Sequence, residues 1–171
     1  MSDRKPGRGR YAHPEREQRW LLEQVPDGVT PVAEIFDRYI HGTQLRLRRT
    51  ENADGIVFKL GQKVRADPAD PEIVSLTNFY LSEGEFNVVL ALPAAELRKT
   101  RSRVRWEDHT AVVDVFHGHL DGLVLAEVEL SAAEPLLTRP PWAAADVTND
   151  DRFSGGALAV ATDATIAALL R

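Results

Sequence analysis

The chain has 171 residues, 43% of them hydrophobic, and its 26 acidic against 21 basic residues give a formal net charge of −5. This length and composition are typical of one globular domain, and the acidic balance argues against a protein that mainly coats nucleic acid. The absence of cysteine excludes thiolate metal sites, cysteine nucleophiles and disulfides, and no apolar run is long enough to cross a bilayer. We therefore expect a cytoplasmic protein with neither a nucleic-acid nor a membrane partner.

The N-terminal end combines a basic tail with a strand of alternating charge. Residues 1–13 are rich in arginine, lysine and glycine, so we expect a disordered tail before one domain over residues 14–171. The first strand is predicted around Glu15, Glu17 and Arg19, because residues two apart in a strand share a face.

The remaining elements follow from turn residues and from the spacing of apolar and charged residues. In chain order we expect a turn over 24–31, a strand or short helix over 34–40, strands over 43–50 and 56–64 joined by a turn at 52–55, a loop over 66–71, an extended segment over 77–92, one or two helical turns over 93–98, a strand over 99–106, a hairpin of 110–116 with 122–130, and a helix from 153 onward.

Charged residues recur at two-residue spacing in several of these strands. The cations are Arg46, Arg48, Lys59, Lys99, Arg101, Arg103 and Arg105, and the anions of the later strands are Asp114, Glu127 and Glu129. A row of cations repels itself by about 1 kcal/mol per close pair even in water, so such a row needs facing anions. A half-exposed sheet would turn these charges to water. Strands that close with the charged face inward would instead form a polar tunnel able to hold metal ions beside an anion.

Short charged motifs occur in a definite order along the chain. They are Glu15-x-Glu17-x-Arg19, Arg46-Leu47-Arg48, Phe58-Lys59, Ser82-Glu83-Gly84-Glu85, Lys99-Thr100-Arg101, Val113-Asp114-Val115-Phe116, Ala126-Glu127-Val128-Glu129 and the segment 146–154. This ordered set resembles the CYTH domain of the triphosphate tunnel metalloenzyme superfamily, whose hallmark is an N-terminal Glu-x-Glu-x-Lys strand. The resemblance covers the chain from Pro14 onward.

The resemblance implies an α+β fold built on a closed eight-stranded antiparallel β-barrel with helices packed outside. It further implies that the protein hydrolyses a small-molecule triphosphate or polyphosphate, with Mg²⁺ or Mn²⁺ as cofactor. We expect a monomer or homodimer. The implied phosphate-binding residues are Arg46, Arg48, Lys59, Lys99 and Arg101, and the implied metal ligands are Glu15, Glu17, Asp114, Glu127 and Glu129. Glu83 and Glu85 are expected on the inner wall beside the substrate-binding residues, either as counter-ions that hold the cations in place or as metal ligands.

Glu17 and Arg19 are the expected catalytic residues, and Arg19 departs from the family pattern. Arginine keeps the positive charge of the motif lysine but does not release its proton near neutral pH. The hypotheses are therefore a tripolyphosphatase, a thiamine triphosphatase or adenylate cyclase of the same family, and a non-catalytic module that binds polyphosphate or organophosphates.

Overall fold

The computed structural model describes residues 5–8, 10–65, 73–131 and 133–170. Its strands are β1 (His13–Leu22), β2 (Thr30–Ile40), β3 (Leu45–Asn52), β4 (Gly55–Arg65), β5 (Ile73–Leu81), β6 (Ala94–Trp106), β7 (His109–His117), β8 (Val124–Glu129) and the short β9 (Ala145–Asp146). Its helices are α1 (Glu83–Leu90), α2 (Gly155–Ala159), α3 (Asp163–Leu169) and the 3₁₀ turns η1 (Gly118–Leu120) and η2 (Asp151–Phe153).

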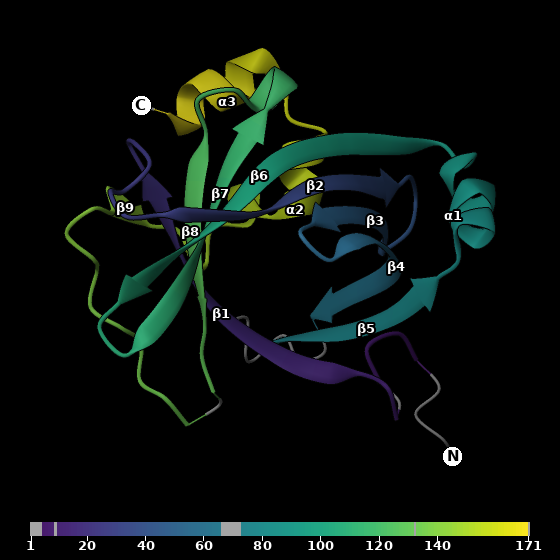
Figure 1. The fold of residues 1–171 in the computed structure, drawn as a ribbon, viewed down its shortest axis with the longest axis horizontal. Coiled ribbons are helices and arrows are strands. Elements are labelled where there is room, and N and C mark those ends of the chain that lie inside the picture. The colour runs from purple at the N-terminus through teal and green to yellow at the C-terminus, as the bar shows by residue number, and fades with distance from the viewer. Residues whose placement is uncertain (1–4, 9, 66–72, 132, 171) are drawn as a thin grey trace.

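The strands β1 to β8 form a closed antiparallel barrel (Figure 1). The sheet runs in the order β5-β4-β3-β2-β6-β7-β8-β1, and β1 also pairs with β5, which closes it. One strand thereby joins both edges: the first half of β1 pairs with β5, as in Glu15 with Val74, and its second half pairs with β8, as in Arg19 with Glu127. The predicted closed eight-stranded barrel is confirmed, and β9 adds a short extra pairing to β1.

The alternation along the strands separates an apolar outer face from a charged inner face. Trp20, Val113 and Ala126 belong to one apolar cluster and alternate with the charged positions of β1, β7 and β8. The segment that follows β8 packs over this cluster through Leu137 and Trp142. The charged side chains of these strands therefore point into the barrel.

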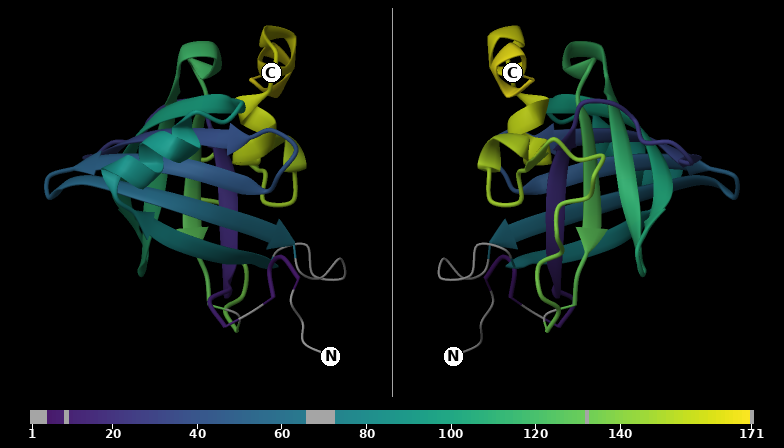
Figure 2. Two further views of the ribbon diagram at one scale, coloured as in Figure 1. Left: turned by 90° about the vertical axis from the view of Figure 1, so that its right-hand side faces the viewer. Right: turned by 90° about the vertical axis from the view of Figure 1, so that its left-hand side faces the viewer.

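A second apolar cluster closes one end of the barrel. Leu97, Phe116 and Leu125 share their strand faces with the inner charged residues, and they pack with Phe153 and Leu158 of the C-terminal segment. Figure 2 shows this segment folded back against the strands. Helices pack outside the barrel as expected, but the C-terminal segment forms two short helices, α2 and α3, instead of one. Phe153 and Leu158 of this segment cover the barrel end.

Gly155 permits this close approach of the C-terminal segment, because a Cβ atom there would overlap the Tyr39 hydroxyl. A Cβ atom at Gly156 would make only an ordinary contact, at 3.6 Å from the same ring. A second helix begins at Asp163 because the Thr162 side chain accepts a hydrogen bond from the Thr165 amide and caps it.

Two sequence predictions in the middle of the chain were wrong. The segment 77–92 is not extended throughout, because Ser82 and Glu85 form a reciprocal capping box that starts α1. Residues 93–98 are not helical: β6 begins at Ala94, which pairs with Ile40 of β2. The segment 34–40 lies within a strand, and the predicted loop over 66–71 falls outside the described residues.

The N-terminal boundary of the domain stays a prediction. Within the described part of the tail, the Gly7 carbonyl accepts a hydrogen bond of 2.7 Å from the Ser75 hydroxyl. None of the helices in the described residues has the length and apolar character needed to span a membrane.

Candidate functional site

The inner wall of the barrel carries a continuous chain of ion pairs. Most links join side chains on neighbouring strands or on strands that share a neighbour, and one, Glu17 with Arg19, lies within β1. In order, the linked residues are Glu15, Lys63, Glu17, Arg19, Glu127, Arg101, Asp114 and Lys99. Cations and anions alternate along this chain, so the repulsion expected for a row of like charges is offset by facing partners.

Asp114 is the most deeply buried anion of this chain. Its carboxylate accepts a hydrogen bond of 2.5 Å from Lys99 and two bonds, of 2.8 and 2.7 Å, from Arg101. Burial acts to raise the pKa of Asp114, but the two cations outweigh it and hold this pKa below its usual range. Burial lowers the pKa of the Lys99 amine, against the attraction of Asp114. Asp114 therefore acts as an anchor for two cations of the inner wall.

A second buried carboxylate, Asp37 on β2, was not among the predicted site residues. It is 0% exposed, and it accepts two hydrogen bonds of 2.6 Å from the Arg48 guanidinium. Burial acts to raise the pKa of Asp37, but Arg48 overcomes this effect and lowers the pKa to about 2. The sequence does place Asp37 on one face of β2, between Ile35 and Tyr39. Its pairing with Arg48 depends on the register between β2 and β3.

Arg19 joins three parts of the structure. Its Nε donates a hydrogen bond of 2.6 Å to Glu127, one Nη donates to the Phe153 carbonyl at 3.3 Å, and the other lies 3.5 Å from Glu17. The attraction of Glu127 raises the pKa of Arg19 against the effect of burial. The same contact, with those of Lys99 and Arg101, holds the pKa of Glu127 well below its usual range despite burial.

The Glu15 and Glu17 carboxylates share one cation, the Lys63 ammonium. Its Nζ lies 3.0 Å from Glu17 Oε2 and 3.2 Å from Glu15 Oε2. Burial acts to lower the pKa of Lys63, but the two carboxylates raise it overall. The sequence placed Lys63 on the same face as Lys59 without assigning it a role.

Arg46 and Lys59 are the inner-wall cations with the weakest anionic partners. Arg46 Nε is 3.9 Å from Asp37 Oδ1, and it is buried without a hydrogen-bond partner among the described residues. Lys59 lies 5.0 Å from the centre of the Tyr80 ring, and no ion pair to it occurs in the described part of the chain. These two side chains are the ones most free to bind an added anion.

Two of the predicted site residues lie elsewhere than expected, and a third is exposed. Glu83 and Glu85 belong to the exposed first turn of α1, where Glu85 accepts a hydrogen bond of 2.7 Å from the Ser82 amide. Their expected place on the inner wall is therefore wrong. Glu129 does lie at the end of β8 opposite Glu17, but it is exposed.

The carboxylates fit a divalent metal by their chemistry, but they do not form a closed cage by themselves. Mg²⁺ and Mn²⁺ favour oxygen ligands, and Mg²⁺ is commonly held by one or two carboxylates together with substrate phosphates and waters. Glu15 and Glu17 lie close enough to share one cation, Lys63. No group of three or more potential ligands assembles within the described residues. This arrangement suits an ion shared between two carboxylates and a bound phosphate.

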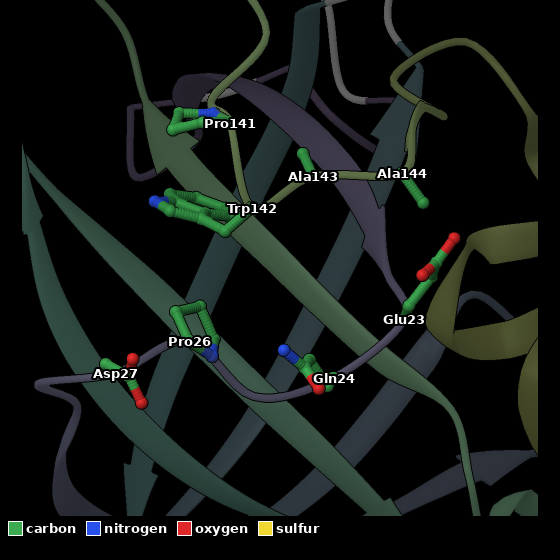
Figure 3. Close-up of a pocket in the computed structure, with 8 residues that line it drawn as sticks. All are labelled: Glu23, Gln24, Pro26, Asp27, Pro141, Trp142, Ala143 and Ala144. Atoms are coloured by element: carbon green, nitrogen blue, oxygen red, sulfur yellow. The ribbon is translucent and has the colours of Figure 1, made fainter.

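A surface pocket of about 530 Å³ lies apart from this wall (Figure 3). It is lined by the turn after β1 and by residues 141–144, and it includes Glu23, Asp27 and Trp142. None of the inner-wall cations or carboxylates lines it, so it is not part of the candidate site.

Two curated proteins are similar to this chain in sequence. An inorganic triphosphatase of Acetivibrio thermocellus is 35% identical over 72 residues, which are 41% of this chain and 46% of that protein. An inorganic triphosphatase of Nitrosomonas europaea is 27% identical over 161 residues, which are 85% of this chain and 97% of that protein. The first match thus spans about half of its relative, and the second spans nearly all of its relative. No family model matches the chain.

Solved structures decide the fold. A structure of an inorganic triphosphatase matches with a TM-score of 0.60 at 24% identity, over 86% of this chain and 95% of that chain. This chain has the CYTH triphosphate tunnel fold. A protein from Pyrococcus horikoshii matches less closely, with a TM-score of 0.51 at 14% identity over 70% of this chain and 79% of that chain. The inner wall described above is accordingly the wall of the CYTH tunnel.

Proposed function

We propose that this chain is a metal-dependent triphosphatase whose preferred substrate is inorganic tripolyphosphate. The observation that carries the proposal is the CYTH tunnel wall, where buried cations and carboxylates alternate inside a closed barrel. Arginine and lysine are the usual side chains for phosphate oxygens. The similarity to proteins named inorganic triphosphatase supports this choice of reaction.

The cations would bind and orient the polyphosphate. Arg46 and Lys59 are free to contact phosphate oxygens directly, whereas Arg48, Lys99 and Arg101 are oriented by buried carboxylates before any ligand arrives. Such preorganised charges stabilise the negative charge of a phosphoryl group during transfer without rearranging. The wall thus holds the phosphate chain in line for attack by water.

The carboxylates would provide the metal side of the site. Glu15, Glu17, Glu127 and Glu129 are the candidate ligands, and Asp114 instead serves to anchor Lys99 and Arg101. A bound divalent ion would neutralise charge on the phosphate oxygens and favour deprotonation of a water molecule. Glu17 and Arg19 lie next to each other on β1. Glu17 can therefore accept a hydrogen bond from the attacking water, while Arg19 keeps Glu127 in place.

The direct test is incubation with tripolyphosphate, thiamine triphosphate and ATP in the presence of Mg²⁺ or Mn²⁺. Phosphate, pyrophosphate and cyclic AMP are measured together. We expect release of phosphate from tripolyphosphate at the highest rate and only with added metal. Cyclic AMP as the main product from ATP, or equal rates without metal, would contradict the proposal.

A non-catalytic polyphosphate binder is the second candidate, and the observation that favours it is Arg19. Its guanidinium is held by Glu127 and cannot supply a proton near neutral pH. If the position acts through charge alone, Arg19→Lys changes turnover little, while Arg19→Ala lowers it strongly. Binding of tripolyphosphate without turnover, with turnover appearing in Arg19→Lys, would establish the binder for the natural chain.

The cellular location and the oligomeric state stay predictions, namely a cytoplasmic protein that is a monomer or homodimer.

A further inference from the structure

Lys63 occupies a special place among the inner-wall cations. It stands on β4, which is separated from β1 by β5: Lys63 and His13 both pair with Leu76. Its side chain nevertheless reaches Glu15 and Glu17 on β1, so that the ammonium lies 3.2 and 3.0 Å from the two carboxylates. The two carboxylates with which the tunnel sequence begins therefore share one ammonium, which offsets one of their two negative charges.

We propose that Lys63 is a resident counter-cation that competes with a divalent metal for Glu15 and Glu17, and that it withdraws from them when metal binds. The inference rests on the proposed function, because it takes these two carboxylates as metal ligands. It goes beyond that function by assigning a role to a lysine outside the expected metal ligands and phosphate-binding residues.

Charge supplies the first argument for competition. A divalent ion needs carboxylate oxygens at roughly 2.0 to 2.6 Å, and an ammonium already lies close to the same Oε2 atom of each glutamate. Holding both cations against one carboxylate pair would bring positive charges within a few ångströms of each other, which is unfavourable at a site partly shielded from water. The metal and the Lys63 ammonium therefore exclude each other from this position.

The second argument is exposure. Among the cations of the ion-pair series, Lys63 is the one best able to leave its carboxylate partners. Its side chain is 36% exposed, whereas that of Lys99 is 10% exposed and is fixed beside Asp114. Arg19 is held at once by Glu127 and by the Phe153 carbonyl. Lys63 alone combines a flexible stem and partial exposure with contacts to carboxylates on one strand only.

The competition has a consequence for the order of binding. Without a polyphosphate, withdrawal of Lys63 costs its ammonium the contacts with Glu15 and Glu17, so metal alone should bind weakly. A polyphosphate in the tunnel offers phosphate oxygens to the displaced ammonium, so metal and polyphosphate should each strengthen the binding of the other. Lys63 is then the residue that couples the two.

The test compares Mn²⁺ binding to the full chain and its variants by isothermal titration calorimetry in the absence of any phosphate compound. Lys63→Met removes the ammonium while keeping the apolar stem, and we expect Mn²⁺ to bind about tenfold more tightly than to the parent protein. Lys63→Arg retains the charge and should bind Mn²⁺ as the parent does. Lys59→Met is the matched control on the same strand face, and it should change Mn²⁺ affinity less than about twofold, since Lys59 has no ion pair to a described carboxylate.

Thermal melting supplies a second readout that turnover does not affect. In a metal chelator, Lys63→Met should melt below the parent, because Glu15 and Glu17 then repel each other without the cation that they share. Added Mn²⁺ should raise the melting temperature of Lys63→Met more than that of the parent.

Equal Mn²⁺ affinity of Lys63→Met and the parent, or an equal gain in Lys59→Met, would overturn the inference. Failure of Lys63→Met to bind Mn²⁺ at all would overturn it as well, because the carboxylate pair would then not be a metal site. Since these measurements use neither substrate nor turnover, tighter Mn²⁺ binding in a protein that hydrolyses nothing would reject the proposed function and leave the role of Lys63 intact.

Discussion

Neutralising Asp37 should destabilise the barrel strongly and in a pH-dependent manner. The carboxylate is 0% exposed and is bound twice by Arg48, and its pKa falls from 3.8 to about 2 in the folded protein. At 1.36 kcal/mol for each pKa unit, this difference corresponds to about 2.5 kcal/mol of stability. Asp37→Asn also leaves the Arg48 guanidinium buried without its counter-charge, so we expect a loss of about 3 kcal/mol at pH 7.

The sign of the pH dependence follows from the lowered pKa. Stability from Asp37 is fully present above 3.8, where the unfolded carboxyl is ionised, and it is lost as the pH falls through about 2. Urea unfolding at pH 7, 4 and 2.5 measures the difference between Asp37→Asn and the parent, and this difference should shrink as the pH falls. Asp108→Asn, in the exposed turn between β6 and β7, is the control. A loss below about 1 kcal/mol at pH 7, or one that does not change with pH, would refute the assignment of a stabilising buried pair.

Three further predictions concern the tunnel and its closed end. Arg46→Ala should weaken tripolyphosphate binding in calorimetry by about tenfold or more, through loss of a charge-assisted contact. Its melting temperature should change little, because the ion pair of Arg46 is weak. Unchanged affinity would place the phosphate site elsewhere. Glu127→Gln with Glu129→Gln should abolish metal-dependent turnover measured against metal concentration, and parental turnover would contradict their role as ligands. Gly155→Ala should lower stability by about 1 to 3 kcal/mol through overpacking against Tyr39, and Tyr39→Phe in the same chain should recover part of the loss in thermal melting.

Charge alternation predicted the barrel strands because charged residues recur at every second position. This pattern can be read within one strand and does not depend on which strands pair with it. The positions of Arg46, Lys99, Asp114 and Glu127 on the inner face follow from it directly. Their pairing does not, because each partner depends on the register between strands far apart in the chain. Asp37 shows this limit: its own strand carries one inward charge, and only the alignment of β2 with β3 brings Arg48 to it.

The two wrong segments around α1 have opposite physical causes. Glu83 and Glu85 also occur at two-residue spacing, but Ser82 with Glu85 three residues later is a capping signal that favours a helix start, and it was available in the sequence. Residues 93–98 carry a proline followed by good helix formers, so local preference favours a helical turn. Pairing of this segment with β2, as in Arg38 with Glu96, overrides that preference.

Arg19 has a structural reason to stand where the family motif has lysine. Its guanidinium donates in two directions at once, to Glu127 on β8 and to the Phe153 carbonyl of the segment that covers the barrel end, and it also lies near Glu17. A lysine ammonium is a single point charge and cannot span these contacts with the same fixed geometry. In this chain the first strand is thus tied to the C-terminal segment by an arginine, while the amine closest to Glu15 and Glu17 comes from Lys63 on β4. Tying the wall to the C-terminal segment and facing the carboxylate pair are therefore separate tasks here, carried by Arg19 and Lys63 on different strands.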